Sequence, residues 1–282
     1  MGLAYLAKGK YGDAVSELTD AAAKMPWDET VFYRLGMAYR QLGNTDQARE
    51  AYEKAREINP KNPAAHYQLA LLARARGDFD EAIRDLDEAL ALKPDAVHLI
   101  KAKATTYLGK KQPEKALSFL KNQLEEHKKN TQVAAALHEL KGTVFLLQRD
   151  LEKSEAAFKE AIELNPALAS AYLSLAGLYR AKNETDKAVS VYEELLDEQP
   201  DQVQAHMELG TIYQTEGQRQ KARKMYEKAL ALNPDFAPAA NNLAWMLLEK
   251  EEDPNRALEL AKIAKAQMPN APSVADTLGL AY

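Results

Sequence analysis

The side chains best suited to chemistry in this chain are five histidines and several adjacent carboxylate pairs. Imidazoles and carboxylates bind a metal ion or transfer protons when two or more of them reach one point. His66, His138 and His206 are separated by 72 and 68 residues and fall at equivalent positions of a repeated sequence pattern. Imidazoles in different repeats cannot share a zinc ion, whose ligands lie about 2 Å from the metal. We interpret these histidines as aromatic-sized side chains that fill helix contacts.

Motifs for catalysis or cofactor binding are missing from the sequence. Carboxylate pairs such as Glu193-Glu194 fall on expected solvent faces, where charged residues are normally only hydrated. No Gly-rich phosphate loop, nucleophile elbow or His-Glu-x-x-His motif occurs. The chain has no cysteine, which excludes thiolate chemistry. The sequence therefore predicts a protein that is not an enzyme, with no cofactor and no metal.

The elements that position these residues recur about every 34 residues. Residues 29–62 form two amphipathic segments hinged at Gly43, with apolar residues at the three- and four-residue spacing of a helix. Each copy closes on a proline, which cannot continue the preceding helix. The closing prolines are Pro26, Pro60, Pro94, Pro166, Pro200, Pro234 and Pro269. We number the positions of each copy so that Glu29 is position 1 of its copy. Small residues then recur at positions 8 and 20, where paired helices approach most closely.

This pattern resembles the tetratricopeptide repeat (TPR), whose signature places an aromatic residue, Leu-Gly, Tyr, Gly, Ala, an aromatic residue, Ala and Pro at fixed offsets. The resemblance covers the whole chain. It implies an all-α fold, a right-handed superhelical solenoid of about eight helix-turn-helix repeats with about seventeen helices and no strand.

The repeats are expected to form a single solenoid over residues 1–282. Their expected bounds are 1–28 (partial), 29–62, 63–96, 97–134, 135–168, 169–202, 203–236, 237–271 and 272–282 (partial). Because the first and last copies are partial, we interpret the chain as a fragment of a longer one. Four additional residues in the fourth copy are expected to lengthen its second helix by one turn, from Pro113 through about His127. Lys103 and Lys141 replace apolar residues, which predicts a weak interface between copies 97–134 and 135–168.

The resemblance also implies where partners bind, because the first helices of TPR proteins line a concave groove. Positions 2, 5, 9 and 12 of each copy face this groove. The candidate protein-binding residues at or beside these positions are Tyr33, Arg34, Met37, Arg40, Tyr67, Leu71, Arg74, Lys101, Thr105, Arg180, Met207, Thr211, Asn241 and Trp245. We expect Arg40, Arg74 and Trp245 to be exposed, and about half of the aliphatic residues to pack on the neighbouring helix.

Charge excludes one class of partner and predicts the polarity of another. With 37 basic and 42 acidic residues, the net charge of −5 argues against nucleic-acid binding. No apolar run is long enough for a membrane span. The groove is expected to be positive over residues 34–101 and neutral to negative later, where Glu139, Glu208 and Asp276 occur. The predicted function is a non-enzymatic scaffold that binds a protein or peptide segment in its groove.

Two alternatives stay open. The first is a structural spacer whose contacts are end to end, since apolar residues such as Leu3, Leu280 and Tyr282 at both ends favour self-association. The second is an assembly accessory that contacts glycans. Residues 241–279 resemble the last repeats of bacterial envelope TPR proteins, including exosortase-linked lipoproteins. This second resemblance implies a periplasmic or envelope location and a role in exopolysaccharide assembly.

Overall fold

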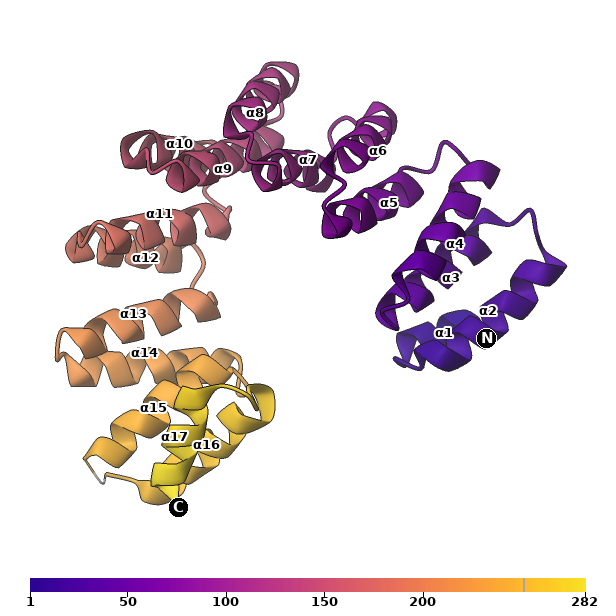
Figure 1. The fold of residues 1–282 in the computed structure, drawn as a ribbon. Coiled ribbons are helices and arrows are strands. Elements are labelled where there is room, and N and C mark those ends of the chain that lie inside the picture. The colour runs from indigo at the N-terminus through magenta and orange to yellow at the C-terminus, as the bar shows by residue number, and fades with distance from the viewer. Residues whose placement is uncertain (251) are drawn as a thin grey trace. The chain divides into compact units, whose positions relative to one another are not determined.

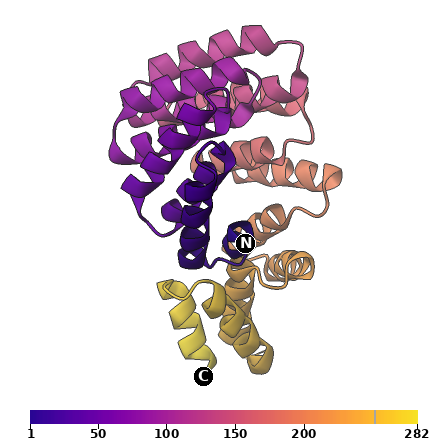
Figure 2. The same ribbon diagram turned by 90° about the vertical axis from the view of Figure 1, so that its right-hand side faces the viewer.

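The computed structural model describes residues 1–250 and 252–282, and within these residues it contains seventeen helices and no strand. The predicted all-α fold is confirmed. Contacts divide the chain into two compact units, Met1–Val144 and Phe145–Tyr282, which are described separately. Consecutive helices form antiparallel pairs that lie side by side within each unit (Figures 1 and 2).

The first unit holds four helix pairs and most of a fifth first helix. Its helices are α1 (Gly2–Ala7), α2 (Tyr11–Lys24), α3 (Glu29–Gln41), α4 (Thr45–Ile58), α5 (Pro63–Arg76), α6 (Phe79–Leu92), α7 (Val97–Gly109), α8 (Pro113–His127) and α9 (Thr131–Leu147), whose last residues belong to the second unit. Helices with odd numbers are first helices, and helices with even numbers are second helices. In Figure 1, α5 and α7 lie on the inner side of the curve of this unit, and α6 and α8 on its outer side.

The second unit continues the same alternation. Its helices are α10 (Leu151–Leu164), α11 (Ala169–Ala181), α12 (Thr185–Glu198), α13 (Val203–Thr215), α14 (Arg219–Leu232), α15 (Ala237–Glu249), α16 (Pro254–Gln267) and α17 (Pro272–Ala281). Its core is one continuous cluster that runs from Phe158 in α10 to Val274 in α17. Neighbouring repeats therefore share one core, as in other solenoids.

Capping and turn residues explain why the helices begin and end where they do. Asp28 and Asn62 each accept a hydrogen bond from a backbone N–H in the first turn of α3 and α5, at 2.9 Å in both cases. In the turns between paired helices from α1–α2 to α13–α14, one residue takes a left-handed backbone conformation. Glycine supplies it at Gly43 (φ 78°), but Lys111 and Arg149 adopt it at φ 60° and 62°. A left-handed backbone is strained for residues other than glycine.

The four additional residues of the fourth copy do not lie where the sequence analysis placed them. Helix α8 has the predicted bounds, Pro113–His127, but its 15 residues exceed the 14 of the other full second helices by only one. Helix α9 has 17 residues, four more than the 13 of α7. The prediction of a longer second helix is therefore wrong, and the extra turn begins α9. Asn130 explains this start, because its Oδ1 accepts a hydrogen bond from Val133 N at 3.3 Å.

Lys103 avoids the cost of burying a charge at its apolar position. Its ammonium group forms an ion pair with Asp87 and lies 4.4 Å from the centre of the Phe119 ring. The division into two units falls within α9, in the repeat that carries Lys141. A weaker interface in this part of the chain stays a prediction.

Candidate protein-binding face

All fourteen candidate residues lie at the surface of first helices. Arg40, Lys101, Arg180 and Trp245 are exposed, and the other ten are half-buried. Residues between them on the same helices, such as Leu35 and Leu69, are buried. The repeat position therefore separates groove candidates from core residues. We call the surface that these candidates form in each unit its first-helix face.

Arg74 is the exception to the expected exposure. Its guanidinium is half-buried because it donates a hydrogen bond to Thr105 Oγ1 at 3.0 Å, from α5 to α7. Tyr67 makes a second link between these helices, with its ring 5.2 Å from the imidazole of His98 in an edge-to-face arrangement. The Tyr33 ring lies 5.5 Å from that of Tyr52, which is buried. Part of the predicted aromatic surface is therefore used in packing, by Tyr33 within its repeat and by Tyr67 between repeats.

Positive charge dominates the first-helix face of the first unit. Arg34, Arg40, Arg74 and Lys101 come from three successive first helices. None of the four forms an ion pair with another described residue. Positions 2, 5, 9 and 12 of these helices contain no aspartate or glutamate. These charges agree with the predicted positive region, which stays a prediction for this unit.

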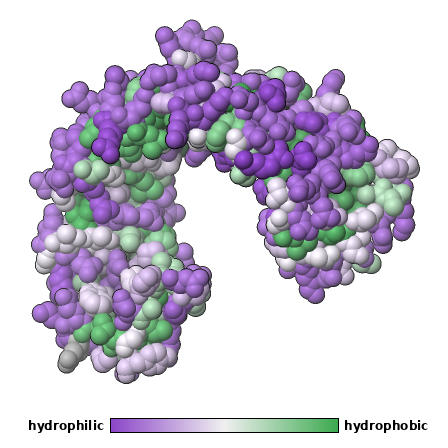
Figure 3. Space-filling model, in the orientation of Figure 1, coloured by the Kyte–Doolittle hydropathy of each residue, from purple (hydrophilic) through white to green (hydrophobic). Residues whose placement is uncertain are grey.

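The corresponding face of the second unit carries compensated charge and a polar network. Arg180 in α11 forms an ion pair with Glu208 in α13. The Tyr226 hydroxyl donates a hydrogen bond to Gln214 Oε1 at 2.7 Å and accepts one from Asn242 Nδ2 at 3.3 Å. These bonds hold one amide of α13 and one of α15 against the same buried tyrosine hydroxyl. Figure 3 shows hydrophobic residues in patches between hydrophilic ones on the visible surface of this unit.

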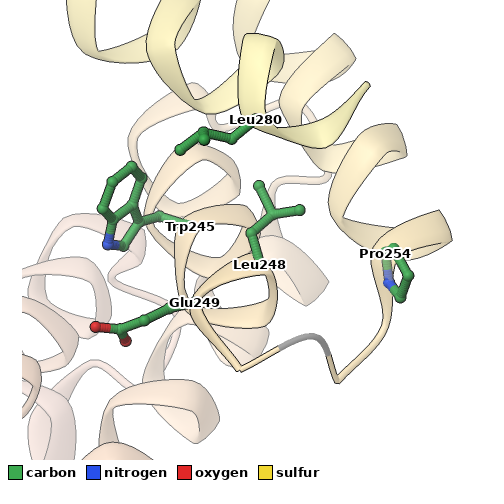
Figure 4. Close-up of a pocket in the computed structure, with 5 residues that line it drawn as sticks. All are labelled: Trp245, Leu248, Glu249, Pro254 and Leu280. Atoms are coloured by element: carbon green, nitrogen blue, oxygen red, sulfur yellow. The ribbon is translucent and has the colours of Figure 1, made fainter.

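Two pockets flank Trp245, which is 41% exposed. The apolar pocket, of about 530 Å³, is lined by Trp245, Leu248, Glu249, Pro254 and Leu280 (Figure 4). The polar pocket, of about 270 Å³, is lined by Gln214, Asn241, Asn242, Trp245, Ser273, Asp276 and Thr277. Leu248, Leu280, Gln214 and Ser273 were missing from the candidate set. All four occupy positions 2, 9 or 12 of their repeats, so the same rule would have found them.

Family comparison decides what these repeats are. Four tetratricopeptide repeat models match the chain, and one of them alone matches residues 1–63, 33–97, 139–203 and 173–216. The other three match residues 73–140, 203–236 and 225–267. The chain belongs to the tetratricopeptide repeat family. TPR repeats typically form non-catalytic scaffolds for protein–protein interaction, which implies protein partners for this chain.

Individual TPR relatives are similar over part of their length. The human protein O-mannosyl-transferase TMTC1 is 28% identical over 150 residues, which cover 53% of this chain and 17% of the relative. The chain spans only 7% and 21% of two further human relatives, superkiller complex protein 3 and tetratricopeptide repeat protein 13. A TPR protein from Parabacteroides merdae has the same fold, with a TM-score of 0.54, 20% identity, and coverage of 90% of this chain and 98% of that one.

The buried histidines serve the TPR fold. His66 Nε2 lies 3.0 Å from the carbonyl oxygen of Pro60, and His206 Nε2 lies 2.9 Å from that of Pro200, so each ring bonds to the loop before its own helix. Burial lowers the pKa of His206. The residues that the structure describes contain no group of three or more metal-binding side chains. No described helix has the length and apolar character needed to cross a bilayer.

Proposed function

We propose that this TPR protein binds an extended segment of a protein partner on the first-helix faces of its repeats and catalyses no reaction. The observation that carries the proposal is the placement of the fourteen candidates. Residues chosen at or beside these repeat positions are all exposed or half-buried, while buried neighbours such as Leu35 and Leu69 on the same helices form the core. A partner would therefore meet Tyr, Trp, Met and Arg side chains, the types that dominate binding energy at interfaces.

The face of the first unit suits an acidic segment. Arg40 and Lys101 are exposed and have no ion-pair partner within the described part of the chain. Carboxylates on the partner would supply the missing charge, and Arg40 can bind one of them in a bidentate manner. Such binding should weaken as salt is added, because exposed charges are screened.

A comparison of two variants with the unaltered chain tests the proposal. In the test variant, Tyr33, Arg40, Arg74 and Trp245 are changed to alanine. In the control variant, the exposed second-helix residues Glu50, Lys54, Glu163 and Lys224 are changed to alanine. Affinity capture from cells that make the protein should lose a partner with the test variant and keep it with the control. An unchanged partner set with the test variant would refute the proposal.

A second candidate is a spacer that acts through its ends, in keeping with the resemblance to bacterial envelope proteins and a periplasmic location. Leu280 in α17 is 61% exposed, and Tyr282, directly after α17, is 83% exposed. Leu3 in α1 is 54% exposed. Apolar side chains exposed in this way favour association between copies. Sedimentation over a range of concentrations should then show association that Leu280→Ser and Leu3→Ser reduce. A monomer at every concentration would eliminate this candidate.

A further inference from the structure

The indole of Trp245 is shared by the apolar and the polar pocket, so a ligand in either pocket touches it. Trp245 lies on α15, and the two pockets extend from it toward α16, α17 and α13. An exposed tryptophan with a hollow on each side offers a large contact area at a small cost in conformational entropy. This arrangement points to one binding site with two halves, which are both mostly apolar in their exposed atoms and differ in the residue types that line them.

The apolar half fits a large hydrophobic side chain. Figure 4 shows Leu248 and Leu280 facing the same space, with the Trp245 ring beside them and Pro254 on the other side. The volume of about 530 Å³ lies within the range of pockets that bind ligands. Leu280 is 61% exposed, so covering it would remove apolar surface from water.

Charge at the two pockets is negative and only partly compensated. Glu249 at the apolar pocket forms an ion pair with Arg219 at 3.0 Å, so its charge is balanced. Asp276 at the polar pocket is exposed and forms no ion pair with the described residues. Neither pocket is lined by lysine or arginine. A cation on a ligand would therefore complement the charge of Asp276.

The rest of the polar half presents amides and hydroxyls. Gln214 and Asn242 are held by the Tyr226 hydroxyl. Asn241 Oδ1 is buried and accepts no hydrogen bond from the described residues. A donor on the ligand would satisfy this acceptor, and a peptide group carries both a donor and an acceptor to match a side-chain amide.

We propose that the two pockets beside Trp245 bind a protein segment in which a large apolar residue is followed within a few positions by lysine or arginine. The apolar side chain occupies the apolar pocket, the cationic side chain pairs with Asp276, and the backbone between them lies over Asn241 and Gln214. This inference rests on the proposed function and names the partner chemistry of one site. An oligosaccharide also uses aromatic and amide groups, but it would leave Asp276 without a cation.

Tryptophan fluorescence of the full chain tests the inference. The chain has two tryptophans, so Trp27→Phe leaves Trp245 as the only reporter. The probes are short synthetic peptides in which leucine or phenylalanine precedes lysine. Matched sets replace lysine by glutamate or the apolar residue by serine, and soluble cello- and chito-oligosaccharides form a further set. We expect a saturable shift of Trp245 emission to shorter wavelength at lower concentration with the peptides that carry both residues than with either matched peptide set, and no shift with the oligosaccharides.

Variants locate the two halves by calorimetry, after circular dichroism confirms that each variant is folded. Asp276→Asn should lower the affinity for lysine-containing peptides about two- to fivefold, the range of an exposed ion pair. Trp245→Ala and Leu280→Ser should each lower the affinity for these peptides at least about thirtyfold, as expected for anchor residues. Trp27→Ala is the matched control and should leave affinity unchanged, because Trp27 lies in the other unit.

The contrary results separate this inference from the proposed function. Equal binding of lysine and glutamate peptides, or a shift caused only by oligosaccharides, would overturn the inference. Peptide binding that Trp245→Ala and Leu280→Ser leave unchanged would also overturn it. If Tyr33, Arg40 and Arg74 were still required for that binding, the proposed function would stand. If calorimetry detects no binding of any peptide set, the inference is overturned, and affinity capture with the Tyr33, Arg40, Arg74 and Trp245 variant still decides the proposed function.

Discussion

Gly36 of α3 lies directly against the ring of Tyr52 in α4. A Cβ atom on Gly36 would be 2.7 Å from Tyr52 Cδ1, closer than non-bonded carbon atoms approach. Tyr52 is fully buried, so its ring has no free space to move into. The same relationship recurs in α13 and α14, where a Cβ on Gly210 would be 2.5 Å from Tyr226 Cε1. A glycine in one helix thus makes room for a tyrosine in its partner.

We predict that Gly36→Ala lowers the free energy of unfolding by about 1–3 kcal/mol, the usual cost of overpacking a core. Gly177→Ala in α11 is the matched control, because no atom lies within 4 Å of its Cβ position. This control should be neutral or stabilising by up to about 1 kcal/mol, from the better helix propensity of alanine. Urea unfolding followed by circular dichroism measures both. Equal effects of the two substitutions would contradict the packing account.

Lys111 and Arg149 each occupy a left-handed turn where other repeats have glycine. We predict that Lys111→Gly and Arg149→Gly each raise the free energy of unfolding by about 0.5–1 kcal/mol, since glycine removes the strain but adds entropy to the unfolded chain. Asn183→Gly should change it less, because asparagine tolerates this conformation at φ 58°. Thermal melts of the three variants would show the order, and a loss of stability in the first two would disprove it.

The carboxyl group of Glu155 should make the stability of the second unit sensitive to acid. Burial would raise the pKa of its carboxyl, but hydrogen bonds from Lys182, Lys159 and Tyr179 outweigh burial and lower the pKa to about 2. The last two bonds are 2.9 and 2.8 Å long. Because the folded pKa is below the unfolded one, the stabilisation is present above about pH 4.5 and is lost as pH falls toward 2. Glu155→Gln should flatten this part of the stability profile, and an unchanged profile would argue against the ion cluster.

The imidazole of His206 should give the stability of the protein a second, milder dependence on pH. Burial lowers the pKa of its imidazole, opposed by its hydrogen bond to Pro200. The unfolded state therefore binds a proton before the folded state does, and stability should fall as pH drops below about 6.5. His206→Tyr, which matches Tyr172 at the equivalent position, should remove this loss between pH 7 and 5. Melting temperatures across that range provide the measurement, and parallel curves for the variant and the unaltered chain would refute it.

The sequence predicted the helix pairs well because each boundary depends on local chemistry. Pro113 begins α8 as expected. Gly43 lies in the turn between α3 and α4 and takes a left-handed backbone conformation with φ 78°. The extra turn was misplaced because four residues lengthen either helix equally well by periodicity alone. Asn130 was the missed signal, since asparagine favours the position just before a helix.

The position of a residue within its repeat predicts whether it lies at the surface, but not which side chains it contacts. Position 9 identified Trp245 as exposed, and the same position holds Leu280 of the apolar pocket. The half-burial of Arg74 could not be predicted, because it depends on the orientation its side chain takes to bond to Thr105 in the next repeat. The pairing of Arg180 with Glu208 likewise depends on how two first helices pack.

Site-specific photo-crosslinking tests the central claim, that partners bind the first-helix faces, most directly. A photoreactive phenylalanine analogue is placed at Tyr67 or Met207 on first helices, and at Glu163 or Lys224 on second helices, in cells that make the protein. All four positions are accessible in the structure. We predict that the analogue at Tyr67 or Met207 crosslinks to a discrete protein partner and the analogue at Glu163 or Lys224 does not. Crosslinks that arise only from the second-helix positions would contradict the account.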